Sequence, residues 1–389
     1  MIRKLFVGIV GLLVVCAGVF FAYGARFIDG RMNRVIQAPP YAVSPEAGAL
    51  HAGLRVADMH DDLLLWPRDP LAKGSRGSTD IPRLAEGNVA VEIFSTVSKT
   101  PRGQNYAANS GETDNITLLA IAELRPPGNW TSLLERARWT SAKAHDAERR
   151  SGGALVLVTT ASDLERALVK RDGTRRTVIG VLSVEGLQVL EGRASNLDTL
   201  HALGFRMAGL THFFDNDVAG SAHGIVKGGL SPLGREVVQG MEQKGMIVDL
   251  AHLSPQAVND VLAMATRPVV VSHGGVAAVC PGPRNWTDDQ LRLLTVNGGV
   301  IGIGFWDAAI CDATPRGVAR AIKHAVEVAG IDHVGLGSDW DGAITAAFDA
   351  TGLPLVTEAL LAEGFTPAQV AQVMGENVIR VLLQGLPTG

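Results

Sequence analysis

Six segments of this chain combine a strand-like run of Val, Ile, Leu or Gly with an ending that can bind a metal ion or move a proton. In a β/α barrel the chemistry takes place at the carboxyl ends of the strands, which meet at one rim. Such endings in chain order therefore predict an active site at the rim of a barrel. The endings are DMHDD (58–62), SVEG (183–186), LTH (210–212), DLAH (249–252), VSHG (271–274) and GSDWDG (337–342).

Eight strand-like segments alternate with amphipathic helical stretches. Strands that alternate with helices of this length pair in parallel, and eight such units favour a closed barrel over an open sheet. We therefore expect an α/β fold, a TIM-type (β/α)8 barrel. The expected strands are 54–59, 88–96, 177–184, 205–211, 246–251, 268–272, 299–305 and 333–338. The expected helices are 197–203, 232–243, 255–264, 288–295, 315–329, 356–363 and 367–383, with further helix within 112–150.

A ninth apolar run, 155–158, has no place in an eight-stranded barrel. Its length fits either an additional outer strand or the end of a helix, because short apolar runs do not separate the two. The sequence leaves both alternatives open.

The N-terminus carries a membrane signal. Arg3 and Lys4 precede 19 uncharged residues, 5–23. A basic start followed by an apolar run predicts export, and this run is long enough to span a bilayer. We expect 1–24 to be an uncleaved signal anchor, with a signal peptide cleaved near Ala22-Tyr23-Gly24 as the alternative.

The rest of the chain then lies outside the cytoplasm, in the periplasm or the extracellular space, because the basic end stays inside. Cleavage of the N-terminal segment would release the protein as a secreted form. Residues 25–50 contain three prolines and are expected to be a linker, and residues 51–386 form the barrel domain.

Charge and cysteine content give further information on the class of protein. The chain has 35 basic and 39 acidic residues without a basic block, so nucleic-acid binding is not expected. Cys280 and Cys311 are the two cysteines outside the apolar run. In an exported chain they are a natural disulfide pair, and two buried thiols are the alternative.

The strand endings supply candidate metal ligands. His60 and Asp62 are two residues apart on an extended segment and point to the same side, and mixed nitrogen and oxygen ligands suit zinc. Glu185 follows an apolar strand and has two oxygens that could bridge two metals. His252 and His273 end two consecutive strands at the same level, where neutral imidazole is a common metal ligand.

Other residues near these endings suggest substrate chemistry. His212 ends a third strand at the level of the other histidines. Asp339 and Asp341 close the last strand, and a carboxylate near an activated water can accept its proton and return it to a leaving group. Arg284 lies one short loop beyond His273 and could bind a carboxylate in bidentate fashion.

Taken together, the residues resemble those of the membrane (renal-type) dipeptidase family, zinc peptidases with a distorted eight-stranded β/α barrel. The resemblance covers about 56–383 of the chain. The motifs that carry it are D-x-H-x-D at 58–62, T-D-I-P at 79–82, V-E-G at 184–186, L-T-H at 210–212, G-L-S-P at 229–232, D-x-x-H-x-S at 249–254, S-H at 272–273, R-N at 284–285 and G-x-D-x-D-G at 337–342.

The resemblance implies a role for each candidate residue. His60 and Asp62 would hold one Zn²⁺, His252 and His273 a second, and Glu185 would bridge the two. A metal-bridging hydroxide would then hydrolyse the peptide bond of a dipeptide.

Three further residues would serve the substrate. His212 would stabilise the developing charge on the carbonyl, Arg284 would hold the terminal carboxylate, and Asp339 would transfer the proton. The family disulfide corresponds to Cys280 and Cys311.

Two departures from the family pattern concern substrate preference. Gly274 stands where the family often has serine, and the loop after His212 lacks the expected aromatic-rich sequence. Because a fold does not fix its substrate, a related metal-dependent amidohydrolase acting on a lactam, lactone or other small amide or ester is the alternative function. A membrane-tethered binding protein without activity is a second rival. The preferred dipeptides, and whether the chain is a monomer or a homodimer, are left open.

Overall fold

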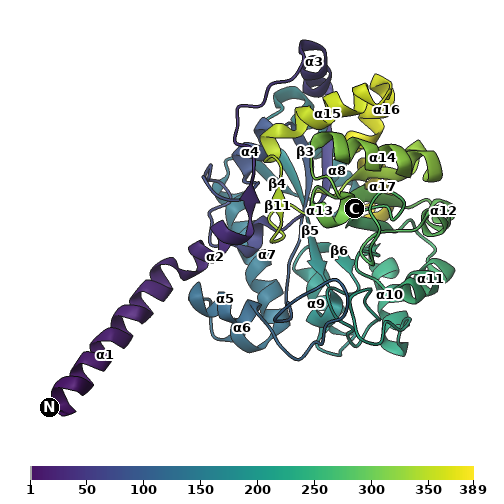
Figure 1. Cartoon of the computed structure of the whole chain (residues 1–389). Coiled ribbons are helices and arrows are strands. Elements are labelled where there is room, and N and C mark those ends of the chain that lie inside the picture. Colours follow the sequence, from purple (N-terminus) through teal and green to yellow (C-terminus); the bar gives the residue numbers. More distant parts are fainter. Residues whose placement is uncertain (1) are drawn as a thin grey trace.

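The structure is a computed structural model that describes residues 2–389, and its centre is a closed barrel of eight parallel strands surrounded by helices (Figure 1). The strand order is β3-β2-β10-β9-β8-β7-β6-β5, and pairing of β3 with β5 closes the barrel. The expected (β/α)8 fold is confirmed. The strands are β2 (Val56–Asp61), β3 (Val89–Phe94), β5 (Val178–Glu185), β6 (Phe205–Gly209), β7 (Ile247–Asp249), β8 (Val270–Gly274), β9 (Val300–Ile303) and β10 (Val334–Leu336).

The ninth apolar run is an additional strand, β4 (Leu155–Leu157). It pairs with the beginning of β5 at Val178–Gly180, whereas β6 pairs with the end of β5 from Leu182 onward. Of the two alternatives that the sequence left open, the structure therefore shows the outer strand.

Helices cover the barrel between successive strands (Figure 1). Several begin with Ser or Thr followed by Pro, as in Ser231-Pro232 and Thr314-Pro315. The hydroxyl accepts a hydrogen bond from a first-turn amide while proline occupies a position that needs no donor. The helices are α3 (Pro45–Gly53), α4 (Ile81–Glu86), α5 (Ile116–Ala122), α6 (Gly128–Thr131), α7 (Leu133–Arg150), α8 (Ala161–Thr174), α9 (Asn196–Ala202), α10 (Pro232–Lys244), α11 (Pro255–Met264), α12 (Asp288–Asn297), α13 (Asp307–Ile310), α14 (Pro315–Ala329) and α15 (Leu353–Ala362).

The last expected helix is interrupted. It consists of α16 (Pro367–Ala371), a π-helical turn (Gln372–Glu376) and α17 (Asn377–Gly385). Gly375 leaves helical geometry within the turn, and a Cβ atom there would lie 1.8 Å from the carbonyl oxygen of Arg55. Only glycine lets the helix approach the chain that enters β2 so closely.

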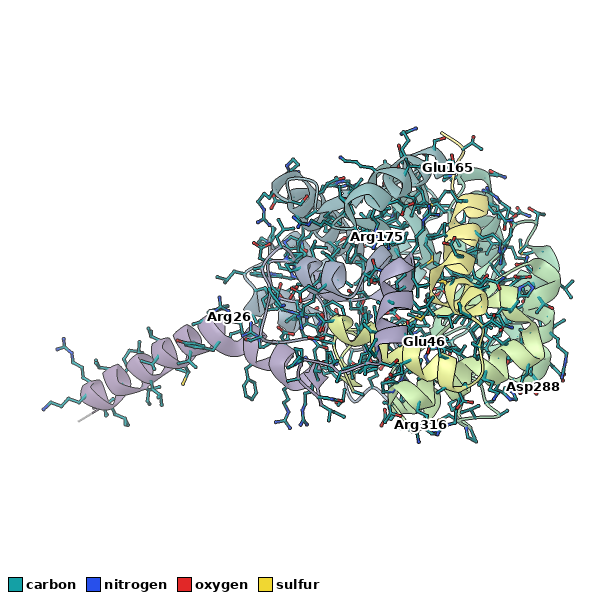
Figure 2. The ribbon with its side chains drawn as sticks, turned by 90° about the horizontal axis from the view of Figure 1, so that it is seen from above. Arg26, Glu46, Glu165, Arg175, Asp288 and Arg316 are labelled. Carbon is teal, nitrogen blue, oxygen red and sulfur yellow. A yellow bond between two sulfur atoms is a disulfide. The ribbon has the colours of Figure 1, made fainter. Side chains whose placement is uncertain are left out.

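The N-terminal segment forms one helix from Ile2 to Met32 that projects from the barrel (Figures 1 and 2). It comprises α1 (Ile2–Val19), a π-helical turn (Phe20–Gly24) and α2 (Ala25–Met32). Its length and apolar composition allow it to cross a membrane, and a signal sequence has the same properties.

Residues 25–50, expected to be a linker, contain regular structure in contact with the barrel domain. Helix α2 is followed by strand β1 (Arg34–Val35), which pairs in parallel with β11 (Thr345–Ala346). Asp29 of α2 is fully buried and lies 3.2 Å from Nε of Arg68. Tertiary contacts with residues far along the chain thus stabilise this segment, although its own sequence gives only a weak indication of helix or strand.

Cys280 and Cys311 form a disulfide, in agreement with the family resemblance. The bond joins the loop after β8 to the end of α13, across 31 residues of chain. Cys16 is a free, exposed cysteine on α1.

We predict that replacing both Cys280 and Cys311 by serine lowers the free energy of unfolding by about 2–4 kcal/mol, because the unfolded chain loses a cross-link. Thermal unfolding with and without reductant measures the effect. Cys16→Ser is the matched control and should leave the transition unchanged. A double variant as stable as the wild type would contradict the prediction.

Candidate metal centre and active site

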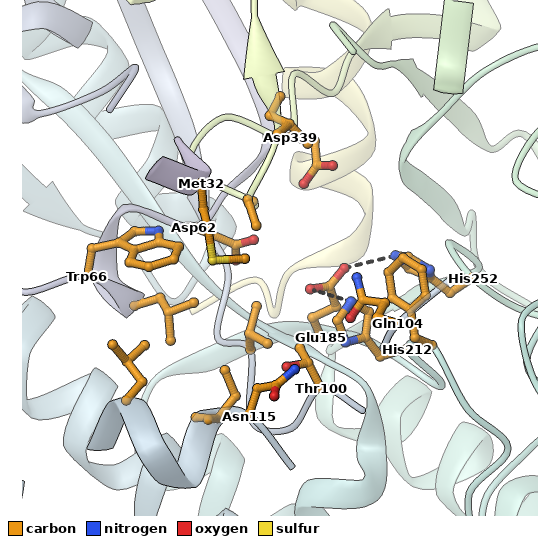
Figure 3. Close-up of a pocket in the computed structure, with 18 of the residues that line it drawn as sticks. Met32, Asp62, Trp66, Thr100, Gln104, Asn115, Glu185, His212, His252 and Asp339 are labelled. Atoms are coloured by element: carbon orange, nitrogen blue, oxygen red, sulfur yellow. Dashed lines mark hydrogen bonds and ion pairs between the residues drawn. The ribbon is translucent and has the colours of Figure 1, made fainter. Parts of the chain in front are cut away.

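The candidate residues from all six strand endings converge at the carboxyl end of the barrel. Figure 3 labels Asp62, Glu185, His212, His252 and Asp339 among them. They line or directly border a single cavity of about 540 Å³ that also contains Arg284. The sequence predicted this convergence, because parallel strands in a barrel end at the same rim. The members are His60, Asp62, Glu185, His212, His252, His273 and Asp339.

Glu185 lies at the centre of the cluster. Its Oε1 atom is 3.0 Å from Nε2 of His252 and 3.3 Å from Nε2 of His273. Its Oε2 atom is 3.3 Å from Nε2 of His212, as the dashed lines in Figure 3 indicate for the residues drawn. The Nε2 atom of His60 is 3.7 Å from Oε1. One carboxylate therefore faces four imidazoles.

Asp62 and Asp339 complete the ring of donors on the side of His60. The Nε2 atom of His60 is 3.7 Å from Oδ2 of Asp62 and 3.9 Å from Oδ1 of Asp339. These separations are too long for hydrogen bonds. They leave room between the donor atoms.

This donor set fits a metal ion. The Nε2 atoms of His252 and His273 are 3.1 Å apart and both lie within 3.3 Å of the same oxygen of Glu185, so three possible metal-binding atoms converge on one point. Among the described residues, Nε2 of His60 and Oδ1 of Asp62 are buried without a hydrogen-bond partner. Buried polar atoms are normally satisfied, and a cation would satisfy these.

A hydrogen-bond chain orients His273. Oγ of Ser272 donates to Oδ2 of Asp249 at 2.6 Å and lies 2.8 Å from Nδ1 of His273. Because the serine proton is directed at the carboxylate, Nδ1 of His273 is the donor in the second contact. The proton is then on Nδ1, and Nε2 presents its lone pair to the cluster, as outer partners of metal-binding histidines do.

Asp58 orients the ending of the last strand, GSDWDG, in a similar way. Its carboxylate accepts hydrogen bonds from the amide and the hydroxyl of Ser338, while the amide of Asp339 donates to the carbonyl of His60 at 3.2 Å. These bonds hold Asp339 beside His60. The sequence placed Asp58 in the first motif but did not identify its partner.

Two cluster residues have a left-handed backbone. The φ angle is +64° at His252 and +61° at Asp339. This conformation is unfavourable for residues with a Cβ and persists where surrounding contacts enforce it, often at functional sites. The strain therefore marks the two positions as ones where side-chain direction matters.

Burial and charge set the protonation of the cluster. Burial lowers the pKa of His212 to about 3 and those of His252 and His273 well below their usual range. These rings are neutral, the form that binds metals. Burial opposes a charge on His60, but the surrounding carboxylates, Glu185 foremost, outweigh it and raise the pKa of His60 to about 10. The cluster thus attracts positive charge.

Arg284 and two aromatic residues border the donors. The Nη2 atom of Arg284 donates to the carbonyl of His273 at 2.7 Å, and its guanidinium lies 5.4 Å from the ring centre of Trp306. The Nε1 atom of Trp306 donates to the hydroxyl of Tyr106 at 3.1 Å. The sequence analysis did not identify Tyr106 or Trp306, since neither follows a strand in a recognisable motif.

The two carboxylates of GSDWDG have separate surroundings. Asp339 borders the cavity, whereas Asp341 is fully buried outside the cluster. Asp341 accepts hydrogen bonds from the amide of Ser78 at 2.7 Å and the hydroxyl of Thr79 at 2.9 Å, and lies 2.7 Å from Nη2 of Arg68. Asp341 thereby ties the T-D-I-P segment to the end of β10.

A barrel of this kind with clustered imidazoles and carboxylates defines the chain as a metal-dependent hydrolase. The comparisons with known proteins are more specific. The family model of the membrane dipeptidases (peptidase family M19) matches residues 45–385. Dipeptidase tcpJ of Claviceps purpurea (strain 20.1) is 32% identical over 319 residues, which cover 80% of this chain and 70% of that protein. Dipeptidase verJ of Clonostachys rogersoniana is 36% identical over 311 residues, which cover 78% of this chain and 75% of that protein.

A solved structure agrees. A metallopeptidase from Rhodobacter sphaeroides, liganded with a phosphinate mimic of the dipeptide L-Ala-D-Ala, matches with a TM-score of 0.70 at 25% identity, over 85% of this chain and 99% of that chain. The chain therefore belongs to the membrane dipeptidase family. It is a metal-dependent dipeptidase, which confirms the resemblance and the enzyme class inferred from the sequence.

We predict that Asp341→Asn destabilises the protein by about 3 kcal/mol, because Arg68 stays buried after losing a charged partner. Denaturant unfolding measures the change. Asp289→Asn is the control, since Asp289 is 90% exposed and its ion pair with Arg292 lies on the surface, where such pairs contribute about 0–1 kcal/mol. Equal stability of the two variants would contradict a structural role for Asp341.

Proposed function

We propose that the protein is a dizinc dipeptidase in which Glu185 bridges the two metals. His60 and Asp62 would hold one ion, and His252 and His273 the other. The observation that carries the proposal is the convergence of the Nε2 atoms of His60, His252 and His273 on one oxygen of a single buried carboxylate, Glu185. When bound, zinc supplies Lewis-acid polarisation of the peptide carbonyl and activates water near neutral pH.

Arg284 would bind the C-terminal carboxylate of the substrate. The guanidinium is held by the carbonyl of His273 and lies beside the ring of Trp306, so it is oriented before substrate arrives. A fixed, buried cation beside the donors favours a substrate whose free carboxylate is close to the scissile bond. A dipeptide meets this requirement, and a longer peptide places its carboxylate too far away.

His212 and Asp339 would serve the reacting atoms. His212, whose Nε2 atom lies 3.3 Å from Oε2 of Glu185, would stabilise the negative charge that develops on the carbonyl oxygen. Asp339 would accept the proton of the attacking water and return it to the leaving amine. Burial raises the pKa of Asp339 to about 7 in the metal-free protein.

The ligand of a relative suggests the stereochemical range of the substrate. The relative from Rhodobacter sphaeroides carries a mimic of L-Ala-D-Ala, and we propose that this chain also accepts a D-residue at the second position. A panel of dipeptides in both configurations at that position tests the function. Absence of metal-dependent, chelator-sensitive cleavage of every dipeptide would overturn it.

We also propose that residues 2–24 anchor the enzyme in a membrane, with the barrel outside the cytoplasm. The run is free of charge from Leu5 to Tyr23, and the basic residues Arg3 and Lys4 precede it. This arrangement keeps the N-terminus on the cytoplasmic side. The disulfide between Cys280 and Cys311 supports the location, since such bonds persist in oxidising compartments.

We predict that His252→Ala reduces the metal content from about two zinc ions per chain to about one and lowers kcat/KM by more than about 100-fold, because loss of even an outer-shell partner costs about 10- to 100-fold. Elemental analysis and a dipeptide assay provide the two measurements. His324→Ala removes a histidine that pairs with Asp288 away from the cluster and should change neither. Retention of two ions by His252→Ala would refute the assignment.

We predict that Arg284→Met lowers kcat/KM for a dipeptide by about 10- to 100-fold, through loss of charge-assisted hydrogen bonds. The wild type should discriminate strongly against the C-terminal amide of the same dipeptide, and the variant should not. A purely structural role would reduce cleavage of acid and amide by the same factor. Arg284→Lys, which keeps the charge, should restore part of the discrimination.

A further inference from the structure

One wall of the active-site cavity comes from the N-terminal helix and not from the barrel. Ile28 and Met32 of α2 line the cavity together with Trp66. Ile28 packs against an apolar cluster formed by Leu65, Trp66, Val97, Ile116 and Leu119. Met32 remains 43% exposed, so an apolar side chain is presented to the open space of the cavity.

The position of α2 is fixed by buried polar contacts. Asp29, fully buried, lies 3.2 Å from Nε of Arg68, and Arg68 also binds Asp341 at 2.7 Å. Oδ1 of Asn33 accepts a hydrogen bond from the amide of Ala343, which itself lines the cavity. Pairing of β1 with β11 continues the connection. The helix is therefore tied to the loop that carries Asp339.

Ile28, Met32 and Arg284 all line the same cavity. In the view of Figure 3, Met32, Asp62 and Trp66 appear on one side of Glu185, and His212 and His252 appear on the other. Arg284 contacts the carbonyl of His273, whose ring adjoins that of His252. A dipeptide with its carboxylate on Arg284 therefore directs its first residue toward Asp62 and α2.

We propose that α2 forms the binding site for the side chain of the first residue, and that the enzyme prefers dipeptides with a large apolar residue at that position. This proposal rests on the proposed role of Arg284 in fixing the direction of the substrate. An apolar side chain that enters the space beside Ile28 and Met32 leaves water for a hydrophobic contact, whereas glycine gains nothing there. The residues that make this contact belong to α2, which follows the apolar N-terminal run. The N-terminal helix and the active site are therefore functionally linked.

The proposal holds whether the N-terminal segment is retained or cleaved. The small residues Ala22 and Gly24 precede α2, which begins at Ala25. Cleavage at that point would leave Ile28, Asp29 and Met32 on the mature chain. The full-length protein in detergent micelles is therefore a suitable sample.

The test compares Ile28→Ser and Met32→Ser with Phe27→Ser. Phe27 lies on the same helix and is 68% exposed but does not line the cavity, so its variant controls for loss of an apolar side chain from α2. The assay measures kcat/KM for Leu-Ala and Gly-Ala, and for the reversed series Ala-Leu and Ala-Gly.

We expect Ile28→Ser and Met32→Ser each to lower the ratio of kcat/KM for Leu-Ala to that for Gly-Ala by about 5- to 10-fold, since small losses of apolar contact in a pocket have effects of about this size. The change should arise in KM. Phe27→Ser should keep the wild-type ratio, and none of the variants should alter the ratio of Ala-Leu to Ala-Gly.

An unchanged Leu-Ala to Gly-Ala ratio in both variants would overturn the proposal, as would a change confined to the reversed series. Both outcomes presuppose that the wild type cleaves dipeptides. A wild type that cleaves no dipeptide of the wider panel, in either configuration at the second position, would refute the proposed function instead.

Discussion

The convergence of four imidazoles and three carboxylates on a buried space at the rim is the constraint on which this structure depends. Such groups repel one another or lose hydration when they are buried without a positive charge between them. Glu185 is central because the nitrogens of His252, His273 and His212 all lie within 3.3 Å of its oxygens. A metal ion relieves the conflict.

The rim positions donors by means of a second layer of polar groups. Asp249 acts on His273 through Ser272, and Asp58 acts on the last strand ending through Ser338. These partners are short side chains on neighbouring strands, so the backbone ladder sets their separation. The unfavourable backbone conformations at His252 and Asp339 persist because this network and the barrel fix the chain on both sides. The placement of the metal-binding side chains thus depends on the sheet as much as on these side chains themselves.

Much of the fold and most of the site could be predicted from the sequence, because each strand and its ending are adjacent in the chain and a barrel brings all endings to one place. His60 and His273 could be identified in this way although they are 213 positions apart in the sequence. Features that depend on contacts between residues far apart in the sequence could not be predicted. The interruption at Gly375 depends on the carbonyl of Arg55, the role of Asp341 on Arg68, and the order of residues 25–50 on the buried contacts of Asp29.

The continuous helix from Ile2 to Met32 has a mechanical consequence for an anchored enzyme. An α-helix rises about 1.5 Å per residue, so Met32 lies roughly 14 Å along the axis from Tyr23, where the uncharged run ends. A flexible tether would let the entrance of the active-site cavity take any orientation relative to the membrane. A helix instead holds it at a set height and tilt above the lipid headgroups, within about two screening lengths of their charge at physiological salt. The electrostatic potential of the bilayer surface then acts on every peptide that reaches the site.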